Sequence, residues 1–167
     1  MNPLYPKDWP QFFTATIDGW KHLLKEDRYK DIIIKSLQTL RENKKIKIYG
    51  YVIMSNHVHF VWQALPGYTL KQLQVSFTKN TSKEFLKILI AENKSKVYVV
   101  NSADRKHAFW KRNALGIELF TPAVFYQKLN YIHANPVRAG LCLLPEEYRY
   151  SSAKFYNTGE DCFNLLE

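Results

Sequence analysis

Cysteine is scarce in this chain, and its scarcity excludes two classes of small protein. Only Cys142 and Cys162 occur among 167 residues. Two cysteines so far apart can form neither a disulfide-rich framework nor a CxxC zinc site. Hydrophobic residues make up 46% of the chain, and its length suits a single domain with a real core.

Long apolar runs are also missing. No hydrophobic stretch approaches the ~18 residues that a membrane-spanning helix needs. The first ten residues carry three prolines and no apolar segment of the signal-peptide type. We therefore expect a cytoplasmic protein that has no membrane as a partner.

Acidic residues are outnumbered, since 15 Asp and Glu stand against 24 Lys and Arg and give a net charge of +9. This charge favours a polyanionic partner, nucleic acid before an anionic membrane surface. A solvated lysine-rich surface explains the same charge equally well. Aromatic residues reach 15%, and exposed ones can stack on unpaired bases, although most are expected in the core.

What the chain does have is a pair of histidines, His57 and His59, in a stretch typical of a β-strand. Alternate strand residues share one face, so both imidazoles point the same way, about 7 Å apart along the backbone. Such a pair can converge on one divalent metal ion. Two imidazoles leave a metal under-coordinated, however, and a third protein ligand is needed.

The hydrophobic pattern predicts the order of the secondary-structure elements. Strands are expected over 11–17, 46–54, 57–63 and 116–120, and helices over 28–43, 69–92 and 121–134. Two polar segments, Asn80–Ser82 and Asn135–Pro136, are expected to interrupt their helices. Residues 97–112 show no clear pattern.

This order fits an α+β fold, a ferredoxin-like split βαβ sandwich with an antiparallel central sheet. The histidines would lie on a central strand, with Val58, Phe60 and Trp62 on its opposite face. The chain is expected to form one domain, with its core over about 11–140 and a C-terminal extension over 141–167.

The last predicted helix offers polar groups at useful spacing. Tyr131 and Asn135 are four residues apart and share one helix face. Together they can present a nucleophile and a metal ligand. In the alternative interpretation, Tyr131 packs with its apolar neighbours and Asn135 caps the next turn before Pro136, and spacing alone favours that alternative.

Three segments together, residues 49–59, 109–112 and 131–141, resemble the single-tyrosine HUH transposases, specifically the REP-associated tyrosine transposases and their insertion-sequence relatives. Residues 150–153 add a weaker match, and the similarity spans roughly 11–156. The family's proline before the Asn-His motif is Ser55 here, which should change the stiffness of the turn rather than the chemistry.

The resemblance implies a set of roles at a metal-dependent DNA-cleaving site. His57 and His59 would bind Mg²⁺ or Mn²⁺, Asn135 would be the third ligand, and Tyr131 would attack the phosphate of single-stranded DNA to give a 5′-phosphotyrosine link. Tyr126 is the reserve nucleophile. His133 ranks below Asn135 because it lies about 200° around the helix from Tyr131.

The resemblance also implies partners. We expect single-stranded or hairpin DNA as substrate, and a homodimer as in many relatives. Arg138, Lys111 and Arg112 are the candidate DNA-binding residues, although a cation at the end of a helix also suits the helix dipole.

Two alternatives remain from the sequence. The chain can be a catalytically silent or host-adopted protein that binds hairpin DNA without cutting it. It can also be a ferredoxin-like RNA-binding domain that uses exposed strand aromatics, but that interpretation leaves the histidine pair unexplained.

Overall fold

The computed structural model describes residues 9–166 and contains one four-stranded sheet with helices on both faces. The strands are β1 (Gln11–Thr16), β2 (Ile46–Ile53), β3 (His57–Ala64) and β4 (Leu115–Glu118). Their order is β2-β3-β1-β4, and every neighbouring pair is antiparallel. This is the ferredoxin-like arrangement that the sequence predicts.

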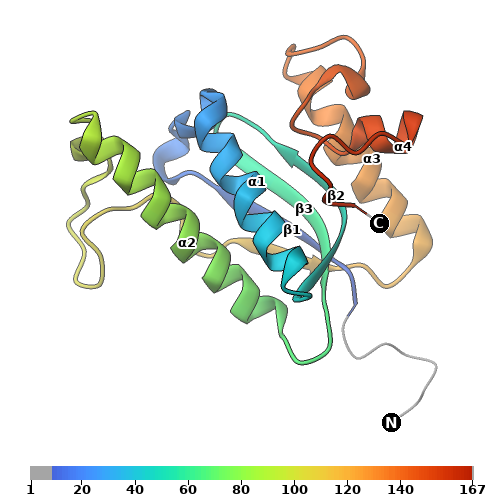
Figure 1. The fold of residues 1–167 in the computed structure, drawn as a ribbon, viewed down its shortest axis with the longest axis horizontal. Coiled ribbons are helices and arrows are strands. Elements are labelled where there is room, and N and C mark those ends of the chain that lie inside the picture. The colour runs from blue at the N-terminus through green and yellow to red at the C-terminus, as the bar shows by residue number, and fades with distance from the viewer. Residues whose placement is uncertain (1–8, 167) are drawn as a thin grey trace.

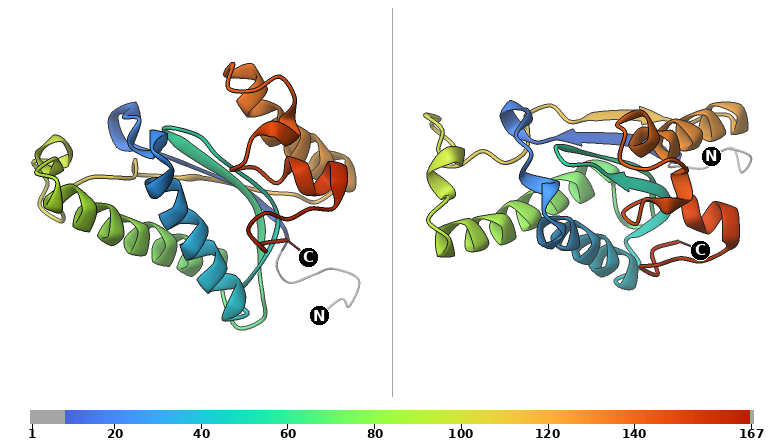
Figure 2. Two further views of the ribbon diagram at one scale, coloured as in Figure 1. Left: turned by 45° about the horizontal axis from the view of Figure 1, so that its top comes forward. Right: turned by 90° about the horizontal axis from the view of Figure 1, so that it is seen from above.

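The helices divide between the two faces of the sheet (Figures 1 and 2). On one face lie α1 (Asp27–Glu42) and α2 (Leu70–Ala91), and on the other lies α3 (Pro122–Arg138). Shorter helices are η1 (Asp18–Trp20), η2 (Leu23–Lys25), η3 (Ser95–Tyr98), η4 (Pro145–Glu147) and α4 (Ala153–Thr158). None of the helices within residues 9–166 is long and apolar enough to span a membrane.

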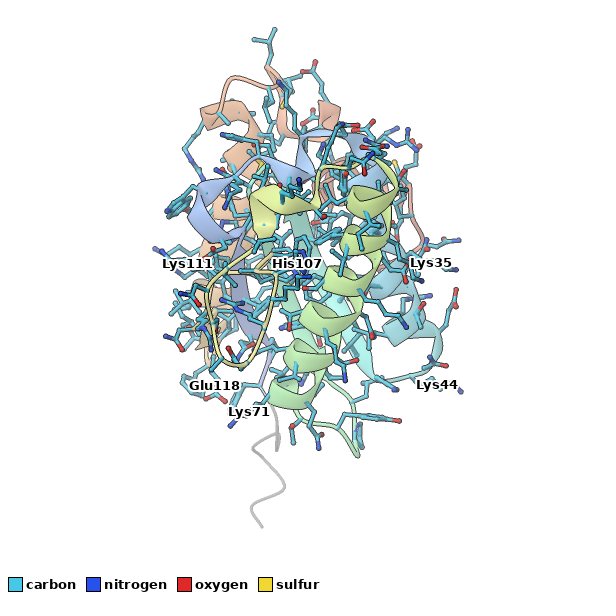
Figure 3. The ribbon with its side chains drawn as sticks, turned by 90° about the vertical axis from the view of Figure 1, so that its left-hand side faces the viewer. Lys35, Lys44, Lys71, His107, Lys111 and Glu118 are labelled. Atoms are coloured by element: carbon cyan, nitrogen blue, oxygen red, sulfur yellow. The ribbon has the colours of Figure 1, made fainter. Side chains whose placement is uncertain are left out.

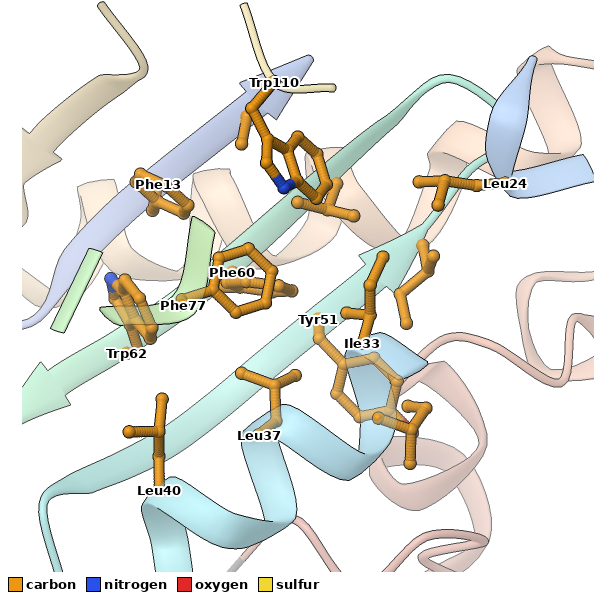
Figure 4. Packing of buried hydrophobic residues seen from close by; sticks show 14 of the residues in the cluster. Phe13, Leu24, Ile33, Leu37, Leu40, Tyr51, Phe60, Trp62, Phe77 and Trp110 are labelled. Carbon is orange, nitrogen blue, oxygen red and sulfur yellow. The ribbon is translucent and has the colours of Figure 1, made fainter. Parts of the chain in front are cut away.

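Strand β3 separates two hydrophobic clusters. Val58, Phe60 and Trp62 are fully buried and belong to the main core beneath α1 and α2, as Figure 4 shows for Phe60 and Trp62. Val61 faces the second cluster, which packs against α3. The predicted alternation of β3 is therefore confirmed, and the two histidines lie on the α3 side.

The missing side chain of Gly50 makes room for side chains of α3 against β2. Gly50 follows a shift in the β2–β3 register after Ile48. A Cβ atom at Gly50 would overlap Leu129 Cδ1 and crowd Ile132 Cδ1, both on α3. Glycine at this position leaves space for the Leu129 side chain where it packs on the strand.

The predicted interruption of the long helix is wrong, because α2 runs without a break through Asn80–Ser82. Thr81 donates its hydroxyl to the Phe77 carbonyl at 2.8 Å and accepts the Trp110 Nε1–H at 2.9 Å. Because both bonds are made within the helical conformation, the buried Thr81 hydroxyl does not disrupt the backbone hydrogen bonds of α2.

The predicted break at Asn135–Pro136 is also wrong, since α3 continues to Arg138. Pro136 stands in the last turn, where its missing N–H removes only one helical bond. The residue is buried, and this packing outweighs that loss. Gly140, at φ +74°, then follows the helix end in the left-handed conformation common at such ends.

Residues 141–166 are part of the same folded body. Tyr150, Leu165 and Leu166 are buried in the main core. The Ile53 N–H donates to the Tyr150 carbonyl at 2.9 Å, and Leu166 forms a parallel bridge with Ile48. The C-terminal segment thus borders the outer edge of β2 (Figure 1).

Candidate active site

The histidine pair lies at the start of β3, where the hairpin from β2 ends. The ring centroids of His57 and His59 are 4.9 Å apart. His59 is 6% exposed and stacks on Phe12 of β1 at 5.1 Å. Strand alternation places both rings on the same face, as the sequence predicts.

One nitrogen of each ring is occupied by a neighbouring side chain. His57 Nδ1 lies 2.8 Å from Asn56 Oδ1, and His59 Nδ1 lies 2.8 Å from the Thr14 hydroxyl. Each contact orients the ring through Nδ1 and leaves Nε2 as the candidate ligand atom, an arrangement that is usual for metal-binding histidines. Sequence reasoning missed Thr14 and Asn56. Thr14 alternates onto the histidine face of β1, and that signal could have identified it.

Asn135 reaches the pair from α3. Its Nδ2 lies 3.1 Å from His57 Nε2. Turning the amide by half a rotation would place Oδ1 at the same spot, because the two ends of an amide are similar in shape. Among residues 9–166, no group of three or more His, Cys, Asp and Glu side chains could hold a metal ion. The side chain that α3 brings to His57 is the Asn135 amide.

Burial keeps both imidazoles neutral. It lowers the pKa of His57, and it lowers the pKa of His59 to about 3, with smaller contributions from His57, Arg138 and Lys128. Neutral imidazole is the form that binds a metal ion. The pair thus has the protonation state and the ring orientation that a divalent cation requires.

Tyr131 lies beside His59 on the same chain. The ring centroids are 5.7 Å apart, and the tyrosine remains 48% exposed. Its helix neighbours Leu129 and Ile132 are buried in the second cluster instead. The alternative in which Tyr131 packs with them is not what the structure shows.

Arg138 also lies at this site. Its guanidinium carbon is 4.5 Å from the centroid of the Tyr131 ring, and Nη2 donates to the Tyr131 carbonyl at 3.0 Å. This position adds a positive charge directly beside the phenol. A cation here can bind a phosphate or offset negative charge that develops on the phenol oxygen.

The two lower-ranked residues of α3 lie elsewhere. His133 is buried, and its Nε2 is 2.7 Å from the Ser152 hydroxyl. Burial lowers its pKa to about 4, so it acts as a neutral link between α3 and the C-terminal segment. Tyr126 is exposed and packs edge-on against Phe125 at 5.4 Å.

Lys111 and Arg112 line a groove of about 690 Å³ between α2 and residues 105–114 (Figure 3). Lys71, Lys79, Arg105 and His107 also line it, and none of its described lining residues is acidic. Arg112 forms an ion pair with Asp104 at 2.6 Å. Its charge is therefore partly neutralised, and Lys111 is the better candidate of the two for binding a phosphate. Phe109 and Trp110 are buried in the core.

Comparisons with known proteins identify the family of this chain. The family model described as "Transposase IS200 like" matches residues 19–113, more than half of the chain. The chain belongs to the IS200-like transposase family. No match was found among curated proteins.

Two solved structures share the transposase-family fold. The structure of a REP-associated tyrosine transposase bound to a REP hairpin is 15% identical, with a TM-score of 0.68, and the match covers 98% of this chain and 90% of that one. A candidate transposase from Deinococcus radiodurans R1 is 13% identical, with a TM-score of 0.50, covering 79% and 94% of the two chains. At these identities the likeness establishes the fold alone.

The matched range of this transposase-family chain includes the histidine pair, whereas α3 lies outside it. Ser55 stands where the resemblance predicts a proline before the Asn-His motif, and two hydrogen bonds stabilise it there. Its hydroxyl is 2.7 Å from His22 Nδ1, and its carbonyl accepts the Leu24 N–H at 2.9 Å. These bonds hold the turn without the stiffness of proline.

Proposed function

We propose that this transposase-family protein is a metal-dependent single-stranded DNA endonuclease and strand transferase that acts through a covalent 5′-phosphotyrosine intermediate. The observation that carries the proposal is the convergence of Tyr131 with His57, His59 and Asn135. Two elements far apart in the sequence, β3 and α3, bring these side chains together in one chain.

The metal ligands in this proposal are His57 and His59 through Nε2, and Asn135 through its amide oxygen. Mg²⁺ or Mn²⁺ held there would polarise the scissile phosphate. The mixed nitrogen and oxygen donors suit Mn²⁺ better than Mg²⁺, which prefers oxygen ligands alone. Asn56 and Thr14 keep the two rings in position.

Tyr131 is the proposed nucleophile. Its phenol gives up its proton as the oxygen attacks the phosphorus atom and forms the phosphotyrosine bond. The bond between phosphorus and the 3′-oxygen breaks, and that oxygen takes up a proton and leaves as a 3′-OH. The guanidinium of Arg138 offsets charge at the phenol or phosphate. Because the new bond is again a phosphodiester, a second 3′-OH can reverse the step and join another strand.

Hairpin DNA is the proposed substrate, since the structurally similar REP-associated tyrosine transposase is bound to a REP hairpin. Arg138 is the proposed contact next to the scissile phosphate. Lys111 and Arg112 are the proposed contacts on the groove beside α2, where clustered positive charge suits phosphates. We also propose a homodimer, on the basis of the family resemblance alone.

The experiment incubates the protein with hairpin-bearing single-stranded DNA and Mg²⁺ or Mn²⁺. We expect a protein–DNA adduct that is lost in Tyr131→Phe and in the presence of a chelator. Tyr126→Phe is the matched control and should form the adduct normally. The reverse pattern would show that Tyr126 is the nucleophile.

The alternative function is a hairpin-DNA-binding protein that does not cut. It predicts tight hairpin binding that neither Tyr131→Phe nor chelation affects, together with no cleavage of any repeat tested. The oriented, neutral histidine pair favours the enzyme, because binding alone requires neither ring to be held through Nδ1.

A further inference from the structure

Trp20 is a large aromatic side chain that the fold holds out in solvent. The residue is 58% exposed and ends the short helix η1. Its φ angle is +57°, in the left-handed region that bulky residues rarely adopt. An asparagine or glycine would fit this backbone better, and the exposed indole gains little from packing. Such an outlier points to a role outside folding.

The turn that carries Trp20 is tied to the histidine end of the sheet. The Ile17 N–H donates to the Asn56 carbonyl at 2.8 Å, and the Lys111 N–H donates to the Thr16 carbonyl at 2.7 Å. Thr16 in turn pairs with His57 across β1 and β3. Lys111, Thr16 and His57 therefore form a row across three neighbouring backbone segments, about 10 Å from end to end.

Strand alternation places the side chains of Thr16 and His57 on the histidine face. Trp110 pairs with Ile17, and both are buried in the main core on the α1 and α2 side. The next residue, Lys111, borders the groove beside α2, and its Nζ lies over the Trp20 ring. In Figure 3, Lys111 lies on the side of the molecule opposite Lys35 of α1.

Lys111 and Trp20 are in contact at the end of this row. The Lys111 Nζ lies 5.3 Å from the centroid of the Trp20 ring. An exposed indole next to an ammonium group matches one nucleotide, since the base stacks on the ring and the phosphate binds the cation. A base within a duplex is already stacked and unavailable, so the pair suits an unpaired base.

We propose that Trp20 and Lys111 form a stacking platform, the Trp20 platform, for one unpaired base of the single-stranded DNA next to the scissile phosphate. The proposal rests on the proposed function for the position of that phosphate. The stacking itself requires neither metal nor cleavage, so it is testable separately.

The test measures binding of a short oligodeoxythymidine to Tyr131→Phe protein in chelator, where no cleavage can occur. Trp20→Asn is the test variant because asparagine tolerates the left-handed backbone. We expect its affinity to fall about tenfold or more while its melting temperature stays the same or rises. A blunt duplex of equal length should bind the two proteins equally.

Tryptophan fluorescence gives a second readout. Trp62 and Trp110 are buried, so thymine should quench mainly Trp20. The quenching should disappear in Trp20→Asn and persist in the control Trp9→Phe.

Unchanged oligodeoxythymidine affinity in Trp20→Asn would overturn the platform, as would an equal loss for the duplex. These outcomes differ from failure of the proposed function. A normal Tyr131 adduct with Trp20-independent binding overturns only the platform, and Trp20-dependent binding without an adduct overturns only the proposed cleavage.

Discussion

At the scale of single residues, the site depends on neighbours that fix the two histidine rings. Thr14 and Asn56 contact His59 and His57 through Nδ1, so both rings are oriented without a metal ion and Nε2 of each ring remains the proposed ligand atom. Loss of such supporting contacts typically weakens metal affinity about 10–100-fold.

Thr14→Val tests this support because valine keeps the shape of threonine and removes only the hydroxyl. We expect Mn²⁺ affinity, measured by electron paramagnetic resonance, to fall about 10–100-fold. Thr16→Val is the matched control, since Thr16 is the next residue on the same strand face and pairs with His57 without a side-chain bond to either imidazole. Equal effects of the two variants would contradict the orienting role of Thr14.

At the scale of elements, the position of α3 decides whether Tyr131 and Asn135 meet β3. That position depends on the absence of a side chain at Gly50, which faces Leu129 and Ile132 of α3. The second hydrophobic cluster, which includes Val61 and Val52, supplies the apolar contact surface on the sheet.

Gly50→Ala should therefore destabilise the fold by about 1–3 kcal/mol, because a well-packed interface must shift to accept the methyl group. Urea denaturation measures the free energy of unfolding. In a Leu129→Ala background the added cost of Gly50→Ala should be smaller, because the overlapping atom is gone. Additive effects of the two substitutions would contradict this explanation of the packing.

The segment after α3 is fastened to β2 by Tyr148, which donates its hydroxyl to the Ile53 carbonyl at 2.7 Å. Burial, with smaller effects of Asp27 and Cys142, raises the pKa of Tyr148 to about 12. The folded state thus favours the neutral phenol, and this stabilisation is fully present below the unfolded pKa of about 10. It is lost as the pH rises from there through about 12.

Tyr148→Phe should consequently reduce the alkaline loss of stability. The free energy of unfolding, followed by circular dichroism, should fall less steeply above about pH 10 in the variant than in the parent protein. At neutral pH the variant should be less stable by about 1 kcal/mol, the usual worth of one hydrogen bond. If the free energy of unfolding falls equally steeply above about pH 10 in the variant and the parent protein, ionisation of Tyr148 does not contribute to the alkaline loss of stability.

The sequence predicts most elements because their signals are local. The alternation around Phe60, the hairpin at Ser55 and the start of α3 at Thr121 depend only on neighbouring residues, and the structure has all three. The uninterrupted helices do not follow from local signals. Thr81 is satisfied by Trp110, and Pro136 is held by burial, so both outcomes depend on tertiary contacts.

The candidate site also has one part that local sequence predicts and one part that depends on tertiary packing. The shared face of His57 and His59 follows from strand alternation alone. Their approach to Asn135 depends on how α3 packs against the sheet, which no spacing within α3 reveals. The family resemblance, rather than the periodicity, points to this meeting.

At the scale of the whole molecule, one chain contains every proposed part of the site. Tyr131 lies 5.7 Å from His59 of its own chain, measured between ring centroids. A dimer is therefore not needed to bring the tyrosine to the histidines in this conformation.

Mixing two inactive variants tests this arrangement. His57→Ala lacks a proposed metal ligand, and Tyr131→Phe lacks the proposed nucleophile. If each site is built within one chain, the mixture should remain unable to cleave hairpin DNA, as measured on denaturing gels. Recovery of cleavage in the mixture would show that the tyrosine serves the partner's histidines.

The most direct test of the central proposal identifies the amino acid that becomes attached to DNA. The parent protein would be incubated with hairpin-bearing single-stranded DNA and Mn²⁺, digested with protease and nuclease, and examined by mass spectrometry. We expect a 5′-phosphonucleotide on the peptide that contains Tyr131, and none when a chelator is present. A nucleotide on any other residue, or cleaved DNA without a covalent adduct, would contradict the proposed mechanism.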